Sequence, residues 1–390
     1  GETVYDLNGH TLTYTGGTVQ PQEGQTLTFR DSSVSGTERG GTLKLTGVKG
    51  TNSALNPQTA ATVNASNIKV ECFGSAFFPQ GDAAAVNITS CDVTADVYCV
   101  GTNAAATDNY GVEINLTDST FTSTATSWTG DDCAVMINVD GTLNIDNCTI
   151  SGHRQGALVR AGEANITNSS IKTHGEYQDG ATKYHNSQWQ SGNEVPAAAL
   201  TVGNYVADDA TTYKADAVVK LTNTKLTAEN SFPALYVDAN TAYSANVTIT
   251  GDDTNVSGAV MKGQQTAAGA ISIAVSGGTF SSDVSKYVDT GYECTGSDTE
   301  WKVDVAQGVE ADATAEDGIA NATVGGNFSN EGNQGENVET EDNTLTVTAT
   351  TGEKGAVNSE VNASNVTIAS ATMSSINAAE AKSDRSHVVL

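Results

Sequence analysis

Short runs of alternating apolar and polar residues fill most of the chain. In "TVNASNIKVE" (62–71), the apolar residues Val63 and Ala65 precede a small turn, and Val70 follows it. A period of two predicts β-strands with one buried face. Gly, Asn, Asp and Ser separate the runs and favour tight turns. Because helix-period patterns are missing from most of the chain, the sequence predicts an all-β fold.

The runs also repeat. "AAAVNITSCDVTA", "YGVEINLTDSTFTS" and "GALVRAGEANITNSSIKT" share an apolar pair, an Asn-Ile-Thr variant, a small polar residue and a second apolar pair. Equivalent positions, 28, 29 and 21 residues apart, are Cys91, Ser119, Cys148 and Ser169. Such units bury their apolar faces only by stacking, and they are too short for crossover helices. We therefore expect a right-handed parallel β-helix over residues 1–303, with a β-sandwich as the alternative that the period disfavours.

Six cysteines are present, and none belongs to a CxxC pair or a Cys/His cluster. A structural zinc site is therefore not expected, and we predict no metal site and no cofactor. Cys91 and Cys148 lie two repeat units apart, which places their Cα atoms roughly 9–10 Å from each other. That separation exceeds the reach of a disulfide, so we expect both to be buried thiols.

The chain has 46 acidic and 18 basic residues, a formal net charge of −28. Such a surface repels phosphate backbones and anionic lipids, so we expect no nucleic-acid partner and no membrane insertion. It also attracts divalent cations, which makes incidental Ca²⁺ binding the one ionic contact that we anticipate. The abrupt start at Gly1 and end in "SHVVL" suggest a mature segment taken from a longer protein.

After Val303 the composition changes. The segment "EADATAEDGIANATVGGNFSNEG" is acidic, rich in Gly and Asn, and nearly free of aromatic residues. We predict a small separate β-rich domain over residues 304–390, with one short helix at residues 373–381.

Three stretches resemble a known group of proteins. The opening "VYDLNGHTLTYTGG…GQTLTFRDSSVSGTERGGTLKLTG" resembles the first coils of β-helix modules with the pectin-lyase-like fold. "GNEVPAAALTVGN" (192–204) and "VSGGTFSSDVSKYVDTGYECTGSDTEWKV" (275–303) resemble the middle and closing coils. Such modules occur in cell-surface proteins of gut Gram-positive bacteria. The resemblance implies an adhesin-like repeat protein that is secreted or displayed on the cell surface.

A second, partial resemblance points to a different class of function. "GDDCAV…TISGH" (130–153) is similar to part of the polygalacturonase-type glycoside hydrolase motif. The resemblance assigns Asp131 and Asp132 to the acid pair and His153 to the histidine, with Asp108 as an upstream carboxylate. Inverting hydrolysis needs two carboxylates on opposite sides of the bond. Because the chain lacks the Arg-x-Lys of the family and orders "TDN" differently, we interpret the Asp pair as turn residues.

One insertion carries most of the candidate binding residues. The segment "HGEYQDGATKYHNSQWQSGN" (174–193) is rich in aromatic side chains, which can stack on sugar rings. Long loops on repeat scaffolds often carry function. The candidate ligand-binding residues are Tyr177, Tyr184, His185 and Trp189, with Trp128 before the Asp pair. The alternative is that these aromatics seal the loop against the coils.

Three functions therefore stand as hypotheses. The first is a non-enzymatic extracellular module that displays loops for binding a glycan or a host or surface protein. The second is a carbohydrate-active enzyme distantly related to polygalacturonases, and the third is a structural spacer.

Overall fold

Two compact units make up the chain. In the computed structural model, one unit comprises Gly1–Val284 with Gly296–Trp301, and the other Ser285–Thr295 with Lys302–Leu390. The structure describes residues 1–50, 52–102, 111–125, 133–174, 197–205, 215–229, 232–240, 243–265 and 269–305, and the strands at 309–314, 338–340 and 346–350.

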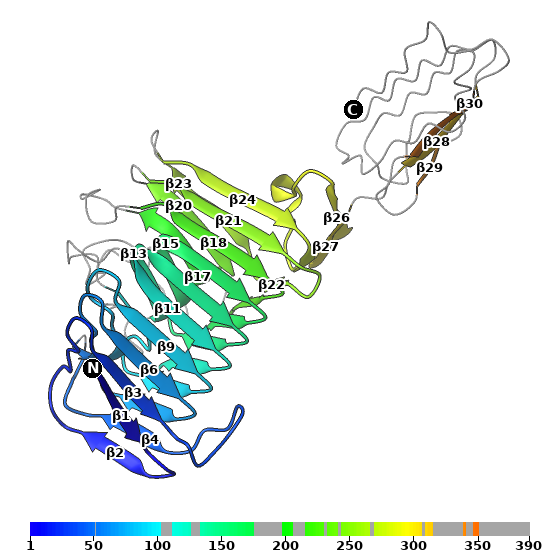
Figure 1. Cartoon of the computed structure of the whole chain (residues 1–390). Coiled ribbons are helices and arrows are strands. Elements are labelled where there is room, and N and C mark those ends of the chain that lie inside the picture. The colour runs from blue at the N-terminus through cyan, green and yellow to red at the C-terminus, as the bar shows by residue number, and fades with distance from the viewer. Residues whose placement is uncertain are drawn as a thin grey trace, which may run out of the picture. The chain divides into compact units, whose positions relative to one another are not determined.

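Parallel strands form three faces of the first unit (Figure 1). Face 1 consists of β1 (Glu2–Asp6), β3 (Thr26–Arg30), β6 (Thr62–Ser66), β9 (Ala85–Thr89), β11 (Val112–Thr117), the second parts of β13 (Cys133–Asp146) and β15 (Gln155–Thr167), β18 (Ala217–Thr222), β21 (Ala245–Thr250) and β24 (Ile271–Ser276). Face 2 consists of β2 (Thr11–Tyr14), β4 (Thr42–Leu45), β7 (Lys69–Cys72), β10 (Asp92–Ala95), β12 (Thr120–Ser123), β14 (Thr149–Gly152), β16 (Ser170–Thr173), β19 (Lys225–Ala228), β22 (Asn255–Ser257) and β25 (Gly278–Phe280).

Face 3 borders the longer connections. It consists of β5 (Ser53–Leu55), β8 (Ser75–Phe77), the first parts of β13 and β15, β17 (Ala198–Tyr205), β20 (Leu235–Asn240) and β23 (Val260–Gln265). Single bridges from Phe77 to Val100 and from Val100 to Val135 join β8 to β13. β13 and β15 are long enough to serve two faces, so β17 pairs with the first part of β15 and β18 with the second.

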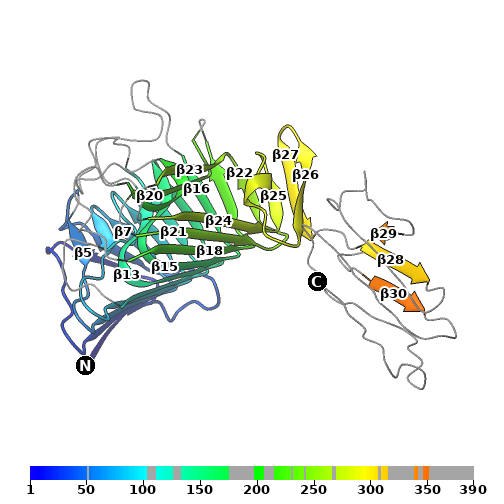
Figure 2. The same cartoon turned by 90° about the horizontal axis from the view of Figure 1, so that it is seen from above.

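The chain visits faces 3, 1 and 2 in turn, and every strand pairs with its counterpart one coil away. From β17 to β25 the three faces alternate strictly in sequence order. Figure 2 shows β18, β21 and β24 lying side by side. This is the parallel β-helix, and the predicted all-β fold class is confirmed.

Inward side chains stack into continuous apolar columns. None in the face 2 column is more than 1% exposed, and its members are Leu43, Val70, Val93, Phe121, Ile150, Ile171, Leu226, Val256 and Phe280. Full burial of such a side chain stabilises the fold by about 1.5–3 kcal/mol. The polar residues between them point outward, which explains the period of two in the sequence.

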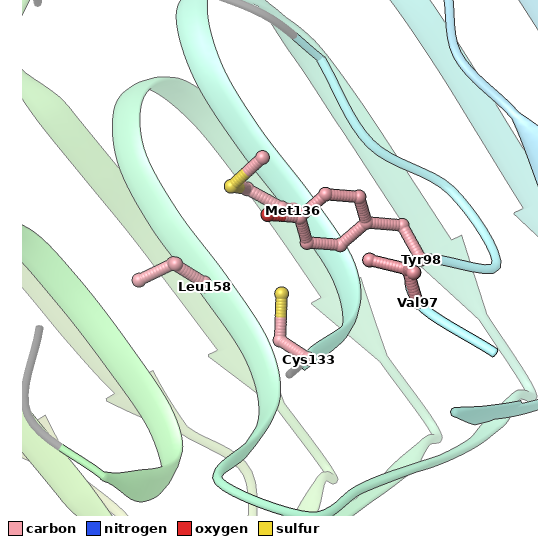
Figure 3. Close-up of a cluster of buried hydrophobic side chains, with 5 residues drawn as sticks. All are labelled: Val97, Tyr98, Cys133, Met136 and Leu158. Carbon is pink, nitrogen blue, oxygen red and sulfur yellow. The ribbon is translucent and has the colours of Figure 1, made fainter. Parts of the chain in front are cut away.

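Face 3 differs because both of its sides are buried around β13. Val135 and Met136 are neighbours in the strand, and both are buried. Met136 pairs with Leu158 on β15 and packs with Val97 and Tyr98 (Figure 3). A strand that is covered on both sides reads as a continuous apolar run, as "CAVMI" does.

The corner between faces 1 and 2 has the same form in six successive coils. Each corner is two residues long, and its first residue has a positive φ of 50–57°: Asn67, Ser90, Asp118, Asn147, Asn168 and Asn223. Asn and Asp tolerate this left-handed conformation better than most residues, which explains their place in the repeat.

The second corner position carries the aligned cysteines. The backbone N–H of Cys91 donates to Ser119 Oγ at 3.0 Å, and that of Cys148 donates to Ser169 Oγ at 3.0 Å. Cys91 and Cys148 are buried thiols two coils apart, which confirms the predicted alignment. Burial raises the pKa of Cys91 to about 11 and that of Cys148 to about 12, so both remain protonated at neutral pH.

An asparagine column runs along the outer side of face 1. Each side-chain amide donates to the Oδ1 of the preceding coil at 2.8–3.1 Å, through Asn64, Asn87, Asn115, Asn144 and Asn165. Asn64 in turn donates to Thr28 Oγ1 at 3.2 Å. The column ends where Lys220 replaces asparagine and pairs with Glu163 at 2.7 Å. These asparagines therefore stabilise coil stacking, and all of them except Asn144 begin an Asn-x-Ser/Thr triplet.

Asp31 organises the first two coils. Its Oδ2 accepts hydrogen bonds from the backbone of Gly9 (2.6 Å) and Gly41 (2.5 Å), and its Oδ1 accepts from the Ser33 backbone (2.9 Å) and hydroxyl (2.5 Å). A Cβ at Gly41 would lie 2.4 Å from the His10 carbonyl oxygen. The "LNGH", "DSS" and "GGT" segments of the opening motif therefore meet at one carboxylate.

The second unit is described only in part. Its three-stranded sheet has β28 (Val309–Thr314) in the centre, antiparallel to β29 (Val338–Thr340) and parallel to β30 (Thr346–Thr350). A 3-10 turn, η1 (Ser285–Tyr287), precedes it. Strands β26 (Tyr292–Ser297) and β27 (Glu300–Val305) contribute residues to both units. The predicted helix at 373–381 lies outside the described residues, and the 303/304 boundary stays a prediction.

Candidate functional site

Most residues singled out from the sequence lie outside the described part of the chain. These are Asp108, Trp128, Asp131, Asp132, Tyr177, Tyr184, His185 and Trp189. Of the candidate residues, His153 lies in the described part of the chain, and the residues around it form the candidate site.

His153 lies at the corner between faces 2 and 3. It follows β14, in which Gly152 pairs with Thr173 of β16, so the next residues, His153 and His174, are neighbours on adjacent coils. Their ring centroids are 6.0 Å apart in an edge-to-face arrangement. The Thr173 hydroxyl donates to the His153 carbonyl at 2.7 Å, and the His174 N–H donates to the Gly152 carbonyl at 2.9 Å. Hydrogen bonds between adjacent coils thus fix the backbone of both histidines.

The His174 ring contacts a hydroxyl. Its Nδ1 lies 2.8 Å from Ser151 Oγ, which is buried. Burial lowers the pKa of the imidazole, the Lys172 ammonium lowers it further, and Glu229 opposes both effects. His174 is therefore neutral at neutral pH. A Ser-His pair at this distance can act in nucleophilic catalysis when a third group orients the imidazole. In the described part of the chain, the His174 ring contacts Ser151 and the His153 ring, and the Glu229 carboxylate acts on it through its charge.

Two arginines near this corner are fully buried, which the sequence did not predict. Arg154 and Arg160 are each 1% exposed, and both take part in interactions. A buried guanidinium requires charged or hydrogen-bonding partners. Arg160 is an extra residue at a bulge, because Val159 pairs with Ile137 and Ala161 with Asn138. The signal in the sequence was a charge inside the otherwise apolar run "GALVRAG".

A buried polar pair lies one coil away on the same face. Thr102 Oγ1 donates to Asn138 Oδ1 at 2.7 Å and accepts from the Asn138 N–H at 2.9 Å. Farther along face 3, Asp238 is 1% exposed and has a partner of its own. Together with the arginines, these groups give face 3 buried charged and amide side chains, whereas the buried polar side chains of the face 2 strands are the hydroxyls of Ser123, Ser151 and Thr173.

No group of three or more His, Cys, Asp and Glu side chains in the described ranges is placed to hold a metal ion. Asp252 and Asp253, a second Asp pair in the sequence, occupy the turn between β21 and β22, where both are outside the buried core.

Comparisons with known protein families, with characterised proteins and with solved structures gave no match. Across the part of the chain that the structure describes, we find no helix with the length and apolar character needed to span a membrane.

Proposed function

We propose that the chain is a non-enzymatic, secreted or cell-surface bacterial module, adhesin-like, whose long connections bind a glycan or a protein outside the cell. The coils resemble those of the pectin-lyase-like group, and on this proposal they serve as a scaffold. The observation that carries the proposal is the uneven distribution of connection lengths around the coils.

The corner between faces 1 and 2 is constant, whereas the borders of face 3 vary. Six successive corners between faces 1 and 2 have two residues each. The connections entering face 3 range from residues 153–154 to residues 174–197, and the one leaving β17 spans 206–216. Repeat scaffolds accept insertions at one side and place their binding residues there. Face 3 is therefore the side on which a ligand would bind.

The chemistry of the insertions favours neutral sugar rings or a protein surface. Residues 174–193 supply Tyr177, Tyr184, His185 and Trp189, and Trp128 lies in the connection from β12 to β13. Flat aromatic rings stack on sugar faces and also anchor protein interfaces. The net charge of −28 disfavours polyanionic glycans.

The described part of the His153 corner gives no specific support for hydrolysis. His153 packs on His174, Arg154 follows it in the corner, and the charges that act on the pKa of His174 are Lys172 of β16 and Glu229. Glycoside hydrolysis depends on a pair of carboxylates at a defined separation. The proposal therefore treats this corner as structural.

A glycan array and a panel of surface proteins, probed with the purified chain, test the proposal. We expect binding that Trp189→Ala weakens and that Trp301→Ala, in strand β27, leaves unchanged. A reducing-sugar assay on polygalacturonate, run with the chain and with Asp132→Asn, should show no turnover. Turnover that disappears in Asp132→Asn would establish the enzyme hypothesis instead. Absence of binding to every glycan and protein tested would contradict the proposal and favour the structural-spacer hypothesis.

A further inference from the structure

One connection between faces 1 and 2 departs from the two-residue corner. Residues 31–41 join β3 to β4, and both ends of this segment meet at Asp31, which accepts hydrogen bonds from the Ser33 and Gly41 backbone at 2.9 and 2.5 Å. Between those ends, none of residues 32–38 is buried. A surface loop of this length whose ends are close together is an Ω-loop, a form that is frequently functional. We call residues 31–41 the strap.

The strap contacts the corner of the next coil through Asn67. The Gly40 N–H donates to the Asn67 carbonyl at 2.8 Å. In return, the Asn67 side-chain amide donates to the carbonyls of Gly36 and Glu38 at 2.7 and 3.0 Å. Asn67 has the positive φ that all six two-residue corners share. The strap therefore binds to a corner of ordinary conformation and does not reshape it.

Arg39 extends the contact to the two coils beyond. Its Nε donates to Asp92 Oδ1 at 3.1 Å, in an ion pair whose side chains are 19% and 45% exposed. Its Nη2 donates to the Asp118 carbonyl at 2.6 Å. A guanidinium carries several N–H donors in a fixed fork, so it can bond two acceptors on adjacent coils at once. Because parallel strands lie about 4.8 Å apart, the strap covers the corners of three coils over about 14 Å.

The strap and the coils beneath it differ in what holds them. The strap has a single apolar side chain, Val34, which is half-buried, whereas Leu43 and Val70 in the strands below are at most 1% exposed. Hydrogen bonds and one ion pair therefore hold the strap, and apolar burial holds the coils. A segment with few buried apolar contacts opens at a lower free energy than a packed core. The strap can therefore open while the coils stay folded.

We propose that the strap opens and closes as one unit over the corners at Asn67, Asp92 and Asp118, and that the Arg39–Asp92 ion pair is the contact that holds it closed. Opening uncovers a carboxylate and two backbone carbonyls on successive coils, which the closed strap occupies with its own donors. Salt screens the ion pair, so rising ionic strength favours the open form. This device is independent of the ligand proposed for face 3.

Limited digestion of the full chain with trypsin measures the opening, because Arg39 is the only basic residue of the strap. When opening and closing are fast, the rate of cleavage follows the population of the open form. Asp92→Asn should accelerate cleavage after Arg39 about three- to fivefold, since it removes a partly exposed ion pair. Asn67→Asp should accelerate it about tenfold, because it removes the amide donor and keeps a residue that tolerates a positive φ.

Glu71→Gln is the matched control. Glu71 lies on the outer side of the same face, one coil before β10, and forms a comparable ion pair with Lys44 at 2.9 Å, a partner outside the strap. Cleavage after Arg39 should therefore be unchanged in this variant. Raising the ionic strength should accelerate cleavage in the wild type and have little effect in Asp92→Asn, a comparison that also corrects for the effect of salt on trypsin.

Hydrogen exchange measured by mass spectrometry distinguishes opening of the strap from unfolding of the coils. In Asp92→Asn, exchange should rise at residues 32–41 and stay as in the wild type at β4 and β7. A parallel rise in β4 and β7 would show that the coils unfold, and it would overturn the proposal. Equal cleavage rates in the wild type and Asp92→Asn, or the same acceleration in Glu71→Gln, would show that the Arg39–Asp92 pair does not hold the strap and would overturn it as well.

Discussion

The carboxylate of Asp31 should control the stability of the first coils and their response to acid. Its side chain is 3% exposed and accepts four hydrogen bonds, two on each oxygen. Burial alone would raise the pKa of this carboxyl, but the hydrogen bonds from Ser33, Gly9 and Gly41 lower it to about 2. Relative to the ordinary value of 3.8, this stabilises the folded coils by about 2 kcal/mol above pH 4.

The direction of the pH effect follows from the lowered pKa. Because the folded-state pKa lies below the unfolded-state value, the stabilisation is present above pH 3.8 and is lost as the pH falls toward 2. Asp31→Asn should lose it at every pH, since an amide places an NH₂ group against backbone N–H donors. We expect this variant to be less stable at neutral pH and to lack the acid transition between pH 4 and pH 2.

Hydrogen exchange measured by mass spectrometry is the suitable assay, because the coils of a solenoid can open locally. Asp31→Asn should increase exchange at residues 1–45 by about 30-fold, the equivalent of about 2 kcal/mol. Asp6→Asn is the control, because an amide oxygen can still accept the hydrogen bond from the Ser32 N–H, and the exposed ion pair with Arg30 that is lost contributes little. Equal exchange in Asp31→Asn and in the wild type would refute the role assigned to this carboxylate.

Three further predictions concern the coils. Cys91→Ser and Cys148→Ser should each change the free energy of unfolding by less than about 1 kcal/mol, because serine already occupies the alternate corners. In the wild type, iodoacetamide should label Cys91 and Cys148 only after denaturation, as mass spectrometry can check. Asn115→Ala should destabilise the fold by about 1–2 kcal/mol in urea titrations, since it removes bonds to Asn87 and Asn144, whereas Thr94→Ala on the outer side of face 2 should not. Phe121→Ala should cost about 3–5 kcal/mol by the same measurement, because it opens a cavity in the face 2 column, and a loss below 1 kcal/mol would contradict the assigned packing.

The fold could be predicted because one short pattern is repeated many times. Alternation identified the strands, and the corner residues identified the period, as the aligned Cys91 and Ser119 show. Each unit predicts the same strand and corner positions as its neighbours, so an ambiguous assignment in one coil is resolved by the pattern of the adjacent coils. The asparagine column was hidden for the same reason, since a triplet such as Asn87-Ile88-Thr89 fits a glycosylation motif and a stacking ladder equally well.

The candidate site could not be predicted to the same degree, because it depends on residues that break the repeat. The resemblance that assigned a catalytic role to His153 depended on spacing, and any two residues one coil apart are brought together in a β-helix. The same rule brought His174 beside His153, a neighbour that the motif did not contain. The buried position of Arg160 depends on a bulge, and a register shift of one residue has no signature in the alternation.

The distribution of polar groups agrees with the proposed division of the coils into a scaffold and a binding surface. On face 1 the outward amides bond to each other from coil to coil, so binding a ligand there would first require these hydrogen bonds to break. On face 3 the strands are buried on both sides near Met136, and the variable connections begin at its borders. Changes in those connections leave the constant corners of faces 1 and 2 intact, because each corner is stabilised by its own coil neighbours. On the proposed function, such a scaffold can therefore change its ligand through the segments 124–132, 174–197 and 206–216 while its coils remain folded.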